Sequence, residues 1–268
     1  MDGDYDTTVW ALMVRIKSYA IFLIILVGLG LLGCGKKEKI RATILPPEIG
    51  ATLQFRGYVT DDEIELTSEI YNFDRTVTEI DTVEGHQVYV FRSENERTPF
   101  YTDDVGTVRQ LVTINLTDKV IPHNLTTPRV TLIKYWETLL KVDQGVGTEW
   151  RVLVDTTFQG IDSTGKPQKI RYYYSAKAKY EGWSQTAIPE VNRFVRVLDV
   201  HWYEIENYVV NETSGDSLFV WRGTAHHYFD PALGLVKYIS DYKKRVMNQS
   251  YVSRHGTWEL VGRKMPTL

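Results

Sequence analysis

The sequence predicts a mainly β protein built on one curved antiparallel sheet, a half-barrel (β-clam) or open barrel, with little helix. The first observation is a repeated alternation of apolar and polar residues with a period of two, which places successive side chains on opposite faces of a strand. The second is a set of turn signals between these segments, at Gly145 to Gly147, Ser163 to Gly165 and Ser214-Gly215. Regularly spaced strands joined by hairpins form sheets that curl in this way.

Residues 1–33 are predicted to be a signal peptide. Arg15 and Lys17 form a short basic segment, an apolar run follows from Tyr19 to Leu32, and Cys34 comes two residues later. The apolar run has about 14 residues, whereas a helix that crosses a membrane needs roughly 20. This layout therefore indicates export rather than a permanent transmembrane helix.

The start of the chain does not fit that layout. Asp2, Asp4 and Asp6 place negative charge where a signal peptide begins with positive charge. We therefore expect that the assigned start is wrong and that translation begins at Met13. N-terminal mass spectrometry of the unprocessed precursor should find Met13 first.

Cys34 is the single cysteine of the chain, so it has no partner for an intramolecular disulfide. The stretch Leu31 to Cys34 resembles the bacterial lipobox, in which the cysteine is diacylated and becomes the new N-terminus. The alternative is a short buried helix, or an uncleaved anchor, that contains an incidental cysteine. The lipobox interpretation predicts that Cys34 is lipidated and that residues 34–47 tether the protein to a membrane.

The tether is basic, but the chain as a whole is not. It contains Lys36, Lys37, Lys39 and Arg41, whereas the chain carries a net charge of -3. No basic field of the size that nucleic acid requires is present in the sequence. Gly35, rather than an aspartate, follows the cysteine. In a Gram-negative cell this predicts an outer-membrane lipoprotein that faces the periplasm.

Residues 48–268 are expected to form a single antiparallel β domain with one core. The segment Thr131 to Lys141 is the best candidate for a helix. The small residues Ala176 and Ala178 are expected to leave room for a ligand or for a covering helix. One apolar row, with two aromatic residues of a later strand, is expected to line the concave face and contact that ligand: Ile170, Tyr172, Tyr174, Ala176, Ala178, Tyr180, Phe219 and Trp221.

The C-terminal part carries a corner motif. A strand runs up to Phe229, Pro231 removes a backbone donor, and Gly234 can supply the positive φ of a tight turn. With Val236-Lys237 after the corner and a closing strand at Glu259 to Val261, this part resembles a widespread group of bacterial lipoproteins that largely lack an assigned activity. The resemblance implies a layout similar to the β-clam of lipoprotein carriers, a highly curved sheet with an apolar concave face.

The sequence contains no convincing catalytic or metal-binding set. Residues Gly215 to Leu218 have the sequence GDSL, which is the block that defines a family of serine esterases. The Asp-x-x-His motif that partners the serine in those enzymes does not occur in this chain. The block is therefore predicted to be the tip of a hairpin. His226 and His227 are adjacent on a strand, so they point to opposite faces and cannot chelate one metal together. His201 lies two residues from Asp199, and we expect a structural hydrogen-bonded pair. No cofactor is expected.

Two function classes remain. The first is a non-enzymatic, lipid-anchored envelope lipoprotein whose curved sheet binds a lipid or another apolar or amphipathic ligand. The second is a structural or interaction lipoprotein whose partner is another envelope protein. A GDSL-like esterase is a remote third. The chain has 17 Tyr and 7 Trp, residues that are common both in cavities and at interfaces. An empty concave face would favour the first class, and a filled one the second.

Overall fold

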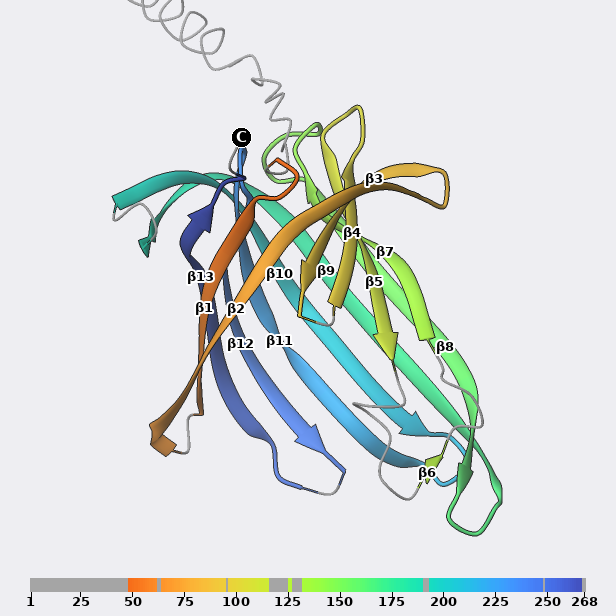
Figure 1. The fold of residues 1–268 in the computed structure, drawn as a ribbon. Coiled ribbons are helices and arrows are strands. Elements are labelled where there is room, and N and C mark those ends of the chain that lie inside the picture. The colour runs from red at the N-terminus through yellow and green to blue at the C-terminus, as the bar shows by residue number, and fades with distance from the viewer. Residues whose placement is uncertain are drawn as a thin grey trace, which may run out of the picture. The chain divides into compact units, whose positions relative to one another are not determined.

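The computed structural model describes residues 48–61, 64–94, 96–115, 125–126, 132–189, 193–247 and 249–266. Cys34, the predicted signal peptide and the tether lie outside these ranges. The described residues form thirteen antiparallel strands of one sheet (Figure 1). The strands are β1 Thr52–Asp61, β2 Ile64–Val83, β3 His86–Ser93, β4 Glu96–Thr102, β5 Thr107–Asn115, β6 Leu125–Thr126, β7 Leu132–Lys141, β8 Glu149–Asp162, β9 Pro167–Ile188, β10 Arg193–Asn211, β11 Asp216–Asp230, β12 Gly234–Val246 and β13 Val252–Lys264.

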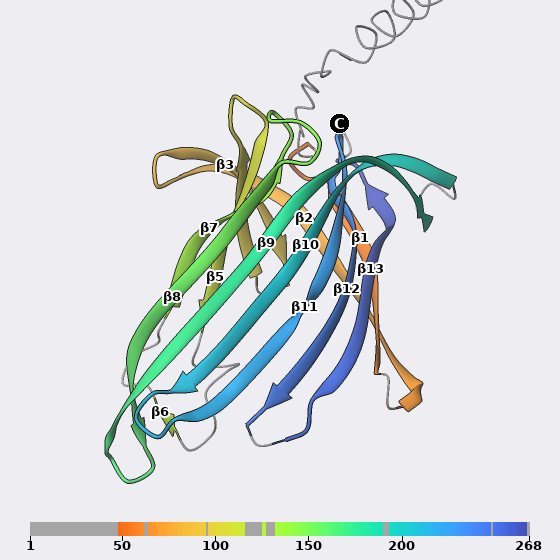
Figure 2. The same cartoon turned by 180° about the vertical axis from the view of Figure 1, so that it is seen from behind.

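The sheet order is β6-β8-β9-β10-β11-β12-β13-β1-β2-β3-β4-β5-β7. The sheet curves so strongly that β7 and β8 lie side by side in both views (Figures 1 and 2). In the described part of the chain no backbone ladder joins these two strands, since β7 pairs with β5 and β8 pairs with β9 and β6. A side chain bridges the seam, because Trp150 Nε1 donates to the Thr138 carbonyl at 2.8 Å. The result is a nearly closed, barrel-like sheet.

The predicted fold class is confirmed. The long strands β9, β10 and β11 form the wall nearest the viewer in Figure 2, and each pairs antiparallel with the next. The β8–β9 hairpin turns at Gly165, with φ 82°, and the β10–β11 hairpin turns at Gly215, with φ 79°. A side chain is strained at such positive φ values, so glycine is the residue that these tight turns favour.

The predicted helix over Thr131 to Lys141 is wrong, because Leu132–Lys141 is strand β7. Ile133 and Leu139 are buried against the interior. Trp136 faces the other side, where its ring packs at 5.0 Å from the ring of Tyr101. Apolar residues on both faces obscure the period of two, and Lys, Glu and Leu are good helix formers. Pairing with β5 overrides this local preference.

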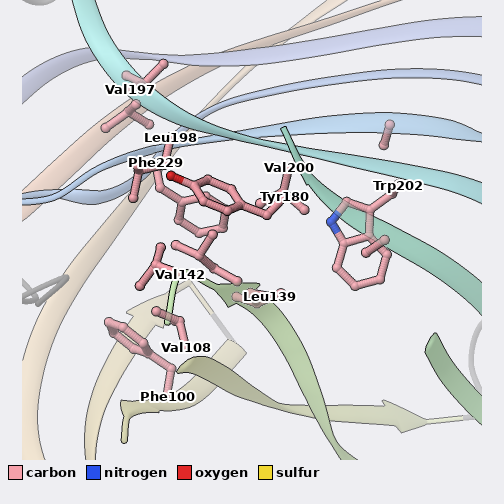
Figure 3. Close-up of a cluster of buried hydrophobic side chains, with 14 of the residues drawn as sticks. Phe100, Val108, Leu139, Val142, Tyr180, Val197, Leu198, Val200, Trp202 and Phe229 are labelled. Atoms are coloured by element: carbon pink, nitrogen blue, oxygen red, sulfur yellow. The ribbon is translucent and has the colours of Figure 1, made fainter. Parts of the chain in front are cut away.

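The main core fills the part of the barrel near the β11–β12 turn. Figure 3 shows Tyr180 and Phe229 gathered with Leu139 and Val142, side chains from opposite walls of the barrel. Each of these four residues is at most 6% exposed. This end of the interior is therefore packed with the protein's own side chains.

Candidate ligand-binding site

The structure places the eight predicted ligand-facing residues on the inner face, but most of them are inaccessible. Tyr174, Phe219 and Trp221 are half-buried. Trp221 lies opposite Asn207, which in turn lies opposite Tyr174, so these side chains share one face. The other five residues are at most 1% exposed, and these are Ile170, Tyr172, Ala176, Ala178 and Tyr180.

The room next to Ala178 is filled by tryptophan, not by a ligand or a covering helix. Ala178 lies between Trp150 on β8 and Trp202 on β10 in the register of the sheet. The two indole rings meet edge to face with their centroids 6.2 Å apart. The methyl side chain makes space for these rings, so this part of the expected ligand surface is core.

Further along the interior the barrel is hollow. A cavity of about 310 Å³, here called the lumen, lies between the walls of the sheet. Its lining comes from β2, β3, β4, β5, β7, β11, β12 and β13. The lining residues are Phe73, Arg75, Ser93, Glu96, Thr98, Gln110, Glu137, Leu139, His227, Leu235, Tyr238 and Trp258. The interior is thus packed near the β11–β12 turn and again around Ile170 and Tyr172, and it is hollow at the lumen.

Glu137 on β7 is the central acidic group of the lumen wall. Its Oε1 accepts a hydrogen bond of 3.0 Å from the hydroxyl of Tyr174 on β9. Desolvation within the barrel raises the pKa of Glu137 to about 7, although the hydrogen bond from Tyr174 opposes the shift. The carboxyl group is therefore close to half-ionised at neutral pH.

Tyrosine rings surround this carboxyl group. Tyr135 and Tyr174 approach each other with ring centroids 6.1 Å apart. Burial raises the pKa of both phenols, and the charge of Glu137 raises each further. The same charge adds to the raised pKa of Tyr172 and of Tyr238. Four tyrosines from three strands therefore lie within electrostatic reach of one carboxylate.

His227 on β11 is a second titratable group of the lumen. Its ring lies 5.1 Å from the ring of Tyr238 and 5.4 Å from that of Trp202. Burial lowers the pKa of His227 to about 3, and the neighbouring His226 contributes to the shift. The imidazole is therefore neutral at physiological pH. No described residue provides a hydrogen-bond partner for its Nδ1.

Arg75 on β2 is the cationic residue of the lumen lining, and its guanidinium group packs against an aromatic ring of the wall. Its guanidinium carbon lies 5.1 Å from the centroid of the Phe91 ring. Burial lowers the pKa of Arg75, and the charge of Glu96 partly restores it. The negative charge of Glu96 therefore favours the protonated form of Arg75.

Aromatic side chains continue the inner wall away from the packed core. Tyr71 lies flat across β1, over Gly57, where an added Cβ atom would come within 2.1 Å of the ring. Glycine is required at that position because any side chain would displace the ring. Tyr71 stacks on Phe73, and Trp221 packs against Tyr242 at 5.2 Å. This inner face is apolar and accessible.

The corner residues form a tight turn. Phe229 is 1% exposed near the end of β11, Pro231 follows in the turn, and Gly234 begins β12 with φ 78°. The carboxylate of Asp230 accepts hydrogen bonds from the backbone N–H groups of Ala232, at 2.8 Å, and Leu233, at 3.1 Å. These hydrogen bonds hold the backbone of the turn that joins β11 to β12.

The GDSL stretch lies at the β10–β11 hairpin, where the Ser217 hydroxyl has no hydrogen-bond partner among the described residues. The expected pair of Asp199 and His201 does not form. Asp199 Oδ1 instead lies 2.9 Å from Nδ1 of His226, and His201 stacks on His226 at 4.5 Å. The register explains the difference, because it places His226 directly opposite His201 on the neighbouring strand.

Within the described ranges no cluster of His, Cys, Asp and Glu could hold a metal ion. Over the same ranges no helix has the length and apolar character needed to cross a membrane.

The polar residues of the lumen were not singled out from the sequence. Arg75, Glu137 and His227 come from strands that are distant in the chain, and the closure of the sheet brings them to one cavity. For Glu137 a signal was present, since it falls on the inward side of a period of two that includes Ile133, Tyr135 and Leu139. The helix assigned to this segment concealed it.

No family model and no curated protein matches the chain. Among solved structures, the chain is similar to a candidate lipoprotein from Parabacteroides distasonis, with 11% identity and a TM-score of 0.36 over 83% of this chain and 98% of the other. It is also similar to the hypothetical lipoprotein YmcC from Escherichia coli, with 10% identity and a TM-score of 0.25. The match covers 89% of this chain and 94% of the other. These scores describe a distant likeness.

Proposed function

We propose that this chain is a non-enzymatic, lipid-anchored lipoprotein of the bacterial envelope whose lumen binds an amphipathic ligand. The observation that supports ligand binding is the partly hollow interior. Phe73, Tyr238 and Trp258 face inward yet remain partly exposed, whereas the core beside them is closed. Side chains that face inward in a filled barrel would be covered.

The chemistry of the lumen supports an amphipathic rather than a purely apolar ligand. Aromatic rings provide large apolar contact areas, and Tyr and Trp also have polar edges. Gln110 and Glu137 add hydrogen-bonding groups to the same wall. Binding sites for small molecules combine a mostly apolar lining with a few polar groups that fix orientation.

The anchor rests on the lipobox-like stretch that ends at Cys34. Acyl chains contribute about 0.8 kcal/mol per buried CH₂, so more than one chain gives stable attachment. In a Gram-negative cell, Gly35 after the cysteine favours the outer membrane, with the domain in the periplasm.

Cell fractionation of a Cys34→Ser variant tests the anchor. The variant should lose membrane attachment or remain unprocessed, because serine cannot carry the thioether-linked lipid. A variant that is processed and membrane-bound like the wild type would refute lipidation at this position. Native mass spectrometry of the mature wild-type protein tests the ligand, and a bound small molecule is the expected result.

An interaction lipoprotein is the second candidate, and the outer face gives it one specific observation. Tyr173 and Tyr208 stack there at 4.6 Å, and His226 stacks on Tyr228 at 6.0 Å. Such partly exposed rings are also typical of protein interfaces. A Tyr208→Asp substitution should abolish the association with an envelope partner if this face carries the function, and should leave it intact if the lumen does.

A further inference from the structure

We propose that the lumen recognises an alkylammonium group, which binds at Glu137 between the tyrosine rings. This inference rests on the proposed ligand-binding function and names the polar group of the ligand. The source of that group is either a free alkylamine or the ammonium of a membrane lipid, since both present the same chemistry.

The first step is the charge of Glu137. Among the described residues it has a hydrogen-bond donor in Tyr174 and no cationic partner. Arg75, in the same lumen, lies over the Phe91 ring, and the charge of Glu96 acts on it. A carboxylate enclosed in this way is unfavourable unless a cation or several donors accompany it. A bound ammonium group would supply both the charge and the donors.

The second step is the surrounding rings. Tyr135 and Tyr174 lie at the carboxyl group, and Tyr238 lies within reach of its charge. Tyr238 also stacks on Trp258, with ring centroids 5.4 Å apart and planes at 15°. The faces of Tyr and Trp rings attract cations within about 6 Å of the ring centroid. A carboxylate within such a set of rings favours an organic cation over an anion or a neutral head group.

The third step is access. Glu137, Tyr135 and Tyr174 are each partly exposed although they face inward. The cavity of about 310 Å³ has room for an ammonium group and a short alkyl chain. Phe73 and the accessible ring of Tyr71 continue the inner wall along β2, where the rest of the alkyl chain would lie.

The test compares three probes with the same alkyl chain, namely octylamine, octanol and octanoate. Isothermal titration at pH 8 uses the full mature chain in phosphatidylglycerol nanodiscs, with empty nanodiscs as the blank. Octylamine should bind at least tenfold more tightly than octanol or octanoate. In Glu137→Gln the affinity for octylamine should fall at least tenfold, while that for octanol stays unchanged. The matched control, Glu48→Gln, removes the same charge from an exposed position and should bind like the wild type.

A second measurement needs no variant. The wild-type affinity for octylamine should rise about tenfold between pH 6 and pH 8, as the carboxyl group of Glu137 ionises. Neither the nearby phenols nor His227 is expected to titrate over this interval. Burial raises the pKa of the nearby phenols and lowers that of His227 to about 3. Burial lowers the pKa of Arg75, and the charge of Glu96 opposes that shift. Octanol should show no such dependence.

The results separate the two proposals. Equal binding of octylamine and octanol, or octylamine binding that Glu137→Gln leaves intact, would overturn the ammonium site but not the ligand-binding lumen. No binding of any probe would overturn both. Nanodiscs that contain phosphatidylethanolamine identify the source: a weaker apparent affinity for octylamine indicates competition from the lipid ammonium, and an unchanged affinity indicates a free amine.

Discussion

The hydroxyl of Tyr174 on β9 donates a hydrogen bond of 3.0 Å to the carboxyl group of Glu137 on β7. These strands are not neighbours in the sheet, since β7 and β9 lie near its two ends. The bond therefore links the two sides of the seam through the interior. It also gives the enclosed carboxyl group a donor.

Removing this hydroxyl should destabilise the fold. Tyr174→Phe leaves the ionised carboxyl group without its donor, so the free energy of unfolding at pH 8 should fall by about 1 to 3 kcal/mol. Urea denaturation measures this change. Tyr173→Phe on the outer face of the same strand is the control and should change stability by less than about 0.5 kcal/mol. Equal effects of the two substitutions would contradict the role of the bond.

The raised pKa of Glu137 predicts a loss of stability with increasing pH. The folded protein keeps the proton up to pH 7, whereas the unfolded chain loses it near the ordinary value of 4.5. The contribution of Glu137 to the free energy of unfolding should therefore fall by about 3 kcal/mol between pH 4.5 and pH 7 and stay constant above pH 7. The difference in urea stability between the wild type and Glu137→Gln, followed over this range, should show this slope. A flat difference would mean that the carboxyl group is not desolvated.

The lowered pKa of His227 predicts the opposite trend, a loss of stability as the pH falls. Its pKa is lowered to about 3 in the folded state, so the unfolded chain takes up a proton first as the pH falls below 6.5. The neutral ring lies among aromatic side chains, and phenylalanine has a similar shape. As the pH falls from 7 to 5, the free energy of unfolding of His227→Phe should therefore increase by about 2 kcal/mol relative to that of the wild type. Thermal denaturation at both pH values measures it, and an equal difference at both would refute the buried neutral imidazole.

The packing at Ala178 predicts sensitivity to added volume. The rings of Trp150 and Trp202 meet beside it, so Ala178→Leu should destabilise the fold by about 1 to 3 kcal/mol through overpacking. The matched control is Ala187→Leu, an exposed position on the same strand, which should be nearly neutral. A neutral Ala178→Leu would show that this part of the interior is open.

The sequence predicts the curved antiparallel sheet because period-two patterns and turn residues are local signals. In β9 they place Ile170, Tyr172 and Tyr180 on the correct side. They do not predict which inward residues are accessible, because this depends on residues from other strands, such as Trp150 and Trp202 next to Ala178. Glu137 was missed for the same reason. Its environment arises from a partner 37 residues away, and its own segment has residues that favour a helix.

Occupancy of the lumen is the central claim, and a cavity-filling variant tests it most directly. Gln110 lines the lumen on β5, whereas Thr113 on the same strand is exposed. Native mass spectrometry of the mature protein extracted from membranes should show a bound small molecule in the wild type and in Thr113→Trp. Gln110→Trp should remain folded and lose that molecule. An unliganded wild type, or a Gln110→Trp variant that retains the molecule, would contradict a ligand-binding lumen.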